Sequence, residues 1–121
     1  LNADFPLSLN IKLPTPTIKL DSFVENYPQI KKIDLIKIDV EGAEADVIKG
    51  SLKIIKNFSP TIIIDLHHNI TKELNNTNFI IKTLKEEGYF IKSLNLENDI
   101  NDNNITYTNS IIAYKKIHTN L

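Results

Sequence analysis

The stretch that decides the fold begins with Ile33-Asp34-Leu35-Ile36-Lys37-Ile38-Asp39-Val40 and continues to Leu66. Its mostly apolar start predicts a buried strand, and Glu41-Gly42 predicts a turn after it. Residues 43–57 carry apolar side chains at helical spacing, and residues 61–66 (TIIIDL) predict a second buried strand. A helix about 22 Å long, at about 1.5 Å per residue, can return the chain to the start of a parallel neighbour. The stretch therefore predicts a right-handed βαβ unit.

The flanking sequence extends this unit into an α/β domain. Residues 7–13 alternate between apolar and polar side chains, which predicts a half-buried strand. A helix is expected near 77–87 and a third strand over 89–94. Residues 110–114 predict a fourth strand, which follows too soon for a helical crossover and should be antiparallel to the third. We expect all 121 residues to form one α/β domain with a mainly parallel sheet and helices on its faces.

Composition excludes several classes of protein. The chain has 14 basic and 15 acidic residues, and this balance argues against a nucleic-acid-binding domain, which usually has a basic face. It has no cysteine, so a disulfide scaffold and a cysteine-ligated zinc site are excluded. No apolar run approaches the ~20 residues that span a bilayer. No secretory signal is visible, so a cytoplasmic location is expected.

Charged residues interrupt the two strands that should be buried. Lys37 and Asp39 lie in the first and Asp65 in the second. A buried charge costs several kcal/mol unless it is paired, so these residues form either a structural ion pair or part of a functional site. Ligands bind at the carboxyl ends of strands in open α/β sheets. We therefore expect Asp39, Glu41 and His67 to meet at this edge.

Several polar residues and Gly50 also have purely structural interpretations. Glu44 falls in the first helical turn, where the helix dipole favours a carboxylate with or without a catalytic role. His67 and His68 could be solvated residues of a loop. Asp21 is most simply a cap at the start of its own helix. Gly50 is expected to let the helix pack closely on the sheet.

Three blocks of sequence resemble one family. They are residues 17–23 (TIKLDSF), residues 34–44 (DLIKIDVEGAE) and residues 47–50 (VIKG), and together they resemble the FkbM family of S-adenosylmethionine-dependent methyltransferases. Residues 60–67 (PTIIIDLH) are similar to the next strand of that family. The resemblance implies a Rossmann-like methyltransferase sheet with a terminal antiparallel strand.

The resemblance also implies a site. Asp39, Glu41 and Glu44 match acidic positions of the family motif and would border the pocket for S-adenosylmethionine. The usual chemistry is O-methylation, here of a small-molecule or glycan hydroxyl, with no metal ligands implied. Such a transfer needs positioning and a base for the hydroxyl proton, and Asp39 and His67 are both candidates for that catalytic base.

The chain departs from the family in one respect. The family binds its cofactor with a glycine-rich turn, and the three glycines here are not spaced to form one. We therefore expect the C-terminal portion of a methyltransferase, with a partial sheet, weak cofactor binding and no activity by itself. The strand at 33–40 would then have an unpaired edge, and the chain is expected to self-associate through it.

Two other interpretations stay open. The first is a non-catalytic α/β binding or interaction module derived from the same fold. The second is a metal-dependent hydrolase with Asp39, Glu41, Asp65 and His67 as ligands.

Overall fold

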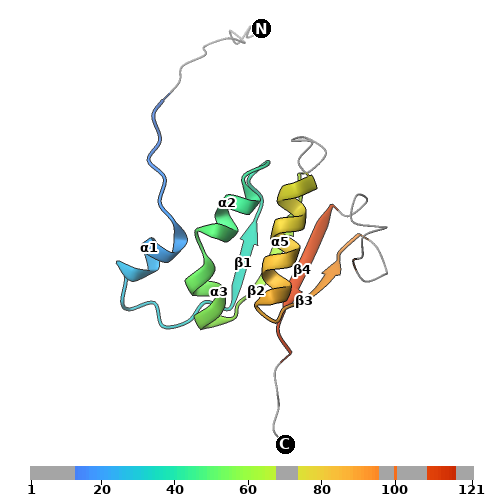
Figure 1. Ribbon diagram of the computed structural model, residues 1–121. Coiled ribbons are helices and arrows are strands. Elements are labelled where there is room, and N and C mark those ends of the chain that lie inside the picture. The colour runs from blue at the N-terminus through green and yellow to red at the C-terminus, as the bar shows by residue number, and fades with distance from the viewer. Residues whose placement is uncertain (1–12, 68–73, 96–99, 101–108, 117–121) are drawn as a thin grey trace, which may run out of the picture.

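The computed structural model describes residues 13–67, 74–95, 100 and 109–116 (Figure 1). Apart from Leu13, the strand expected over residues 7–13 lies outside the described residues, and so does His68. Along the described chain, helices and strands follow one another in the order α1, β1, α2, α3, β2, α5, β3, β4. This order is that of an α/β protein.

The described part of the chain contains one four-stranded sheet in the order β1-β2-β4-β3. Its strands are β1 (Leu35–Ile38), β2 (Thr61–Asp65), β3 (Phe90–Ser93) and β4 (Ser110–Tyr114). β1 pairs in parallel with β2, whereas β4 is antiparallel to both β2 and β3. Three strands therefore run in one direction, and the mainly parallel sheet with a terminal antiparallel strand is confirmed as a partial Rossmann-like fold. The insertion of β4 between β2 and β3 was not predicted.

The helices lie on one face of this sheet (Figure 1). Helices α2 (Glu44–Lys49), α3 (Leu52–Phe58) and α5 (Leu74–Glu86) cover it, and the short α1 (Leu20–Glu25) packs beside α3. Burial alternates along the strands in agreement: Ile62 and Ile64 are fully buried, and Ile63 between them is half-buried. The core joins Ile111, Ala113 and the other buried residues of this sheet face to side chains of the three covering helices, chiefly Ile48, Ile55, Ile80 and Leu84.

The expectation that helices cover both faces is not met within the described residues. Lys37 and Asp65 have the same parity as Ile63, so they lie on the open face and not in a buried layer. β1 has β2 as its strand neighbour, and no other described strand pairs with its second side. Within the described residues, the sheet therefore has one uncovered face, and β1 is an edge strand, as is β3 at the other end of the sheet.

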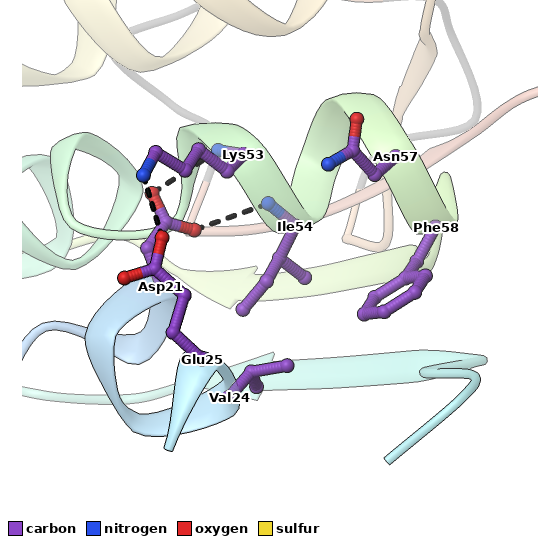
Figure 2. A pocket seen from close by; sticks show the side chains of 7 residues that line it. All are labelled: Asp21, Val24, Glu25, Lys53, Ile54, Asn57 and Phe58. Atoms are coloured by element: carbon purple, nitrogen blue, oxygen red, sulfur yellow. Dashed lines mark hydrogen bonds and ion pairs between the residues drawn. The ribbon is translucent and has the colours of Figure 1, made fainter. Parts of the chain in front are cut away.

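The single helix expected over 43–57 is split into α2 and α3, and Asp21 accounts for the break. Its backbone N–H donates to the carbonyl of Gly50 at 2.9 Å. Its carboxylate accepts from the N–H groups of Lys53 and Ile54 at 3.1 Å each (Figure 2). In a continuous helix the Gly50 carbonyl would serve Ile54. Asp21 thus caps α3 and not its own helix, so that expectation was wrong.

An ion pair next to the Asp21 cap also joins α1 to α3. Lys53 Nζ lies 2.5 Å from Glu25 Oε1, and both residues line a small cavity of about 130 Å³ (Figure 2). Gly50 has the Lys19 side chain nearby, 3.4 Å from the position of an added Cβ. Gly50 therefore allows the segment before α1 to approach closely. The sequence had predicted a different role, close packing of the helix on the sheet.

Candidate functional site

A strained turn carries the chain from the end of β1 into α2. Glu41 has φ 50° and Gly42 has φ 110°, both in the region that L side chains rarely adopt. Gly42 meets this need because it has no Cβ. Its N–H donates to Glu44 Oε1 at 2.9 Å, which folds the Glu44 carboxylate back toward the strand ends. The turn therefore places a carboxylate at the carboxyl edge of the sheet.

Glu44 and His67 form a hydrogen-bonded pair at this edge. Nδ1 of His67 lies 2.6 Å from Glu44 Oε1, and Glu44 is only 5% exposed. An ionised carboxylate can only accept, so Nδ1 carries the hydrogen and the imidazole lone pair is on Nε2. Nε2 lies 3.6 Å from Asp39 Oδ1. The pair thus presents a nitrogen lone pair next to a second carboxylate.

The electrostatics of the pair favour the charged forms. Burial raises the pKa of Glu44, but hydrogen bonds from the Gly42 N–H, its own N–H and His67 outweigh burial and lower the pKa below 4.5. The hydrogen bond to Glu44 is the main cause that raises the pKa of His67 above 6.5. Burial opposes this rise, and the charges of Glu44, Asp39 and Glu41 support it. Glu44 is therefore ionised and His67 binds a proton readily.

A second polar group crosses three strands on the open face. Lys37 Nζ on β1 contacts Asp65 Oδ2 on β2 and lies 3.8 Å from Asp39 Oδ2. Ser110 Oγ on β4 donates to Asp65 Oδ1 at 2.6 Å. The hydrogen bond from Lys37, followed by that from Ser110, lowers the pKa of Asp65. Asp65 thus accepts from both neighbouring strands.

The expectation of buried charges at Lys37, Asp39 and Asp65 was wrong. Their side chains are 47%, 55% and 32% exposed, because no described element covers this face of the sheet. Asp65, and not Asp39, is the nearer partner of Lys37. The ion pair considered for Lys37 and Asp39 is thus one arm of a larger network.

The structure brings together most of the residues that the sequence indicated. Asp39, Glu44 and His67 are in contact range, whereas Glu41 is exposed and acts on His67 through its charge. Sequence reasoning missed Ser110. An antiparallel strand begins at the edge where its parallel neighbours end, and this rule could have placed Ser110 at the carboxyl edge. It could not have placed Ser110 opposite Asp65, because the position of β4 next to β2 was not predicted.

A groove of about 850 Å³ runs beside β1, between the segment before α1 and α2. Lys37 lines it, but Asp39, Glu41, Glu44 and His67 do not. The Glu44 carboxylate is also engaged by Gly42 and His67. This groove therefore does not place a ligand next to these carboxylates.

The part of the chain that the structure describes holds no group of three or more histidine, aspartate or glutamate side chains arranged for a metal ion, so the metal-dependent hydrolase gains no support from it. Nor does any helix within the described ranges have the length and apolar character to cross a bilayer.

Fold and site together define an α/β protein whose parallel strands end in a carboxylate–histidine pair. The family model described as methyltransferase FkbM domain matches residues 7–91, more than half of the sequence, and the chain belongs to this family. Methyltransferase 1 of Beauveria bassiana (strain ARSEF 2860) is 47% identical over 32 residues, which are 26% of this chain and 13% of the relative. The match thus spans about an eighth of that relative. No solved structure matches significantly.

Proposed function

We propose that this chain supplies the acceptor-activating part of an S-adenosylmethionine-dependent methyltransferase that methylates a hydroxyl oxygen of a small molecule or glycan. The observation that carries the proposal is the contact of 2.6 Å between His67 Nδ1 and Glu44 Oε1. A hydroxyl must lose its proton as its oxygen takes the methyl group. The pair is suited to accept that proton, because Glu44 fixes the tautomer and stabilises the imidazolium that forms.

His67 is a better candidate for the base than Asp39. An imidazole titrates in the range in which a general base works best, the Glu44 carboxylate raises the pKa of His67, and the His67 side chain is 20% exposed. The Asp39 side chain is 55% exposed and lies between Lys37 and His67. In this proposal, His67 Nε2 takes the hydroxyl proton, and the Asp39 carboxylate stabilises the resulting positive charge.

The role of the acidic residues in cofactor binding remains a proposal. Asp39 and Glu41 are exposed at the carboxyl edge, where they could contact the methyl donor in the complete protein. Glu44 had the same expected role, but its two hydrogen bonds support a role in orienting His67 instead. A cytoplasmic location also remains a prediction.

We further propose that additional chain completes the domain in the whole protein. The bare edge of β1 and the uncovered face with Lys37 and Asp65 support this, since sheets of this class are usually covered on both faces. The 121-residue chain alone should then be inactive and should self-associate through β1. The alternative, a non-catalytic binding module, would need neither the donor nor His67.

Calorimetry and a transfer assay test these proposals. The 121-residue chain and a version extended to the upstream in-frame start are titrated with S-adenosylmethionine. Both are then assayed for transfer of a labelled methyl group to a panel of sugars and small alcohols. We expect binding and transfer only with the extended protein, and a loss of at least about 100-fold in rate for His67→Gln.

His68→Gln is the matched control, because it removes the imidazole next to His67 in the sequence. Full transfer by the His67→Gln variant would remove His67 from the mechanism. Micromolar donor binding by the 121-residue chain would contradict the fragment proposal, and an extended protein without transfer would favour the non-catalytic module.

A further inference from the structure

The Asp39 carboxylate lies between a cation and an imidazole, and each uses a different oxygen. Oδ2 of Asp39 is 3.8 Å from Lys37 Nζ, and Oδ1 is 3.6 Å from His67 Nε2. Asp39 follows the last residue of β1, so its backbone is no longer held by strand pairing. Its position next to His67 therefore depends on its side-chain neighbours.

Lys37 is itself anchored from two further strands. It contacts Asp65, and the second oxygen of Asp65 accepts from Ser110 Oγ at 2.6 Å. Asp65 and Ser110 are register partners across β2 and β4, so the sheet backbone sets their separation. Lys37 is the register partner of Ile63. Asp65 lies two residues further along β2 on the same face, within reach of a lysine side chain. The lysine is thus held by well-ordered strand positions.

Stability does not explain this arrangement well. Exposed ion pairs contribute little to folding, commonly about 0–1 kcal/mol, and all three charged side chains are partly exposed. The network instead ends next to the one imidazole that the site presents among the described residues. Its geometry suits the positioning of charge better than the stabilisation of the sheet.

We propose that Lys37, anchored on Asp65 and Ser110, is a positioning residue that keeps the Asp39 carboxylate from approaching Nε2 of His67 more closely and partly offsets its charge. This inference rests on the proposed function in taking Nε2 as the atom that accepts the proton. Lys37 thereby limits how strongly Asp39 favours the imidazolium, so that His67 can release its proton again after each turnover.

The charged groups around His67 set the direction of the expected effect. Glu44 faces it from α2, Asp39 from the end of β1 and Glu41 from the turn, with Asp65 of β2 behind Lys37. All four are carboxylates, and Lys37 is the cation that the described contacts place among them. Removal of its charge should therefore raise the pKa of His67.

NMR titration of the 121-residue chain tests this without any activity assay. The histidine ring resonances are followed against pH in the wild type, Lys37→Met, Lys37→Gln and Lys37→Arg, and His67→Asn assigns the His67 signal. We expect the pKa of His67 to rise by about 0.5 unit or more in both neutral variants, the scale on which a unit charge several ångströms away acts near a surface. Lys37→Arg should restore the wild-type value.

Lys82→Met is the matched control, because Lys82 is an exposed lysine on α5 that lies 3.9 Å from Glu86. It removes one positive charge from another element of the fold, α5. Equal His67 pKa values in Lys37→Met, Lys37→Gln and Lys82→Met would overturn the inference. The NMR titration does not depend on methyl transfer. The transfer assay therefore tests the proposed function, and the titration tests the role of Lys37 separately.

Discussion

Nδ1 of His67 lies 2.6 Å from Oε1 of Glu44, although 23 residues separate them along the chain. Glu44 begins α2 and His67 follows β2, so the contact depends on the parallel pairing of β1 with β2. That pairing brings two strand ends to one edge, and the Glu41-Gly42 turn then directs the carboxylate to the imidazole. The following predictions test this pair and the elements that support it.

Glu44→Gln should lower the pKa of His67 toward 6.5. The substitution keeps the shape of the side chain but replaces the ionised acceptor of the hydrogen bond that is chiefly responsible for the raised pKa. Asp39 and Glu41 still favour the imidazolium, so part of the rise should remain. NMR titration of the histidine rings measures the change, and an unaltered His67 pKa would mean that the pair is not formed in solution. Asp46→Asn, on the exposed side of α2, is the matched control.

The pair should stabilise the fold most between about pH 4.5 and pH 6.5. The raised pKa of His67 contributes stability that is fully present below 6.5 and is lost as pH rises through the folded-state value. The lowered pKa of Glu44 contributes stability that is present above 4.5 and is lost as pH falls through its folded-state value. Both contributions are therefore present together only in this window.

Urea unfolding of the wild type and Glu44→Gln at several pH values measures this effect. The free energies of unfolding should differ most inside the window, by about 1.5 kcal/mol, as for hydrogen bonds to charged groups. A difference that is constant from pH 4 to pH 8 would show that the charged pair is not the cause.

Asp21→Ala should destabilise the fold by about 1 to 2 kcal/mol, the usual effect of losing a helix cap. The variant leaves the N–H groups of Lys53 and Ile54 at the start of α3 without their carboxylate acceptor. Chemical unfolding measures the loss. Asp34→Ala is the control, since Asp34 is 70% exposed and pairs with Lys32 at the surface. Equal losses in the two variants would argue against the cap.

Leu35→Lys should reduce self-association of the 121-residue chain. Leu35 is 56% exposed on β1, whose second side is unpaired within the described residues, and charged residues on an edge strand oppose pairing with another chain. Sedimentation at several concentrations should show the wild type associating and the variant shifted toward monomer. Leu52→Lys, at a site 40% exposed on α3, should behave like the wild type. A wild type that stays monomeric throughout would contradict the prediction.

Local patterns were sufficient for much of the fold. The apolar runs at 33–40 and 61–66 predicted β1 and β2, and the helical spacing between them predicted their parallel pairing, which the register confirms. Residues 89–94 and 110–114 likewise correspond to β3 and β4, antiparallel as expected. These elements follow from properties of residues close together in the sequence, namely side-chain periodicity and the length of chain that a crossover connection needs.

The break between α2 and α3 could not be predicted in the same way. It depends on Asp21, which is 33 residues from Ile54 and replaces a helical hydrogen bond with a contact between separate elements. The helical spacing in residues 43–57 does not indicate that the Asp21 carboxylate replaces the Gly50 carbonyl as the acceptor for the Ile54 N–H. The same reason applies to Ser110, which is 45 residues from Asp65.

By itself, the sequence determined which side chains reach the carboxyl edge of the sheet, because Asp39, Asp65 and His67 stand where the two apolar runs end. Only the tertiary structure decided how they are partnered. Sheet order put β4 next to β2, the covering of one face left Lys37 and Asp65 in contact with solvent, and the turn at Gly42 directed Glu44 to His67. These partnerships join residues far apart in the chain, and their geometry is set by packing and not by local spacing.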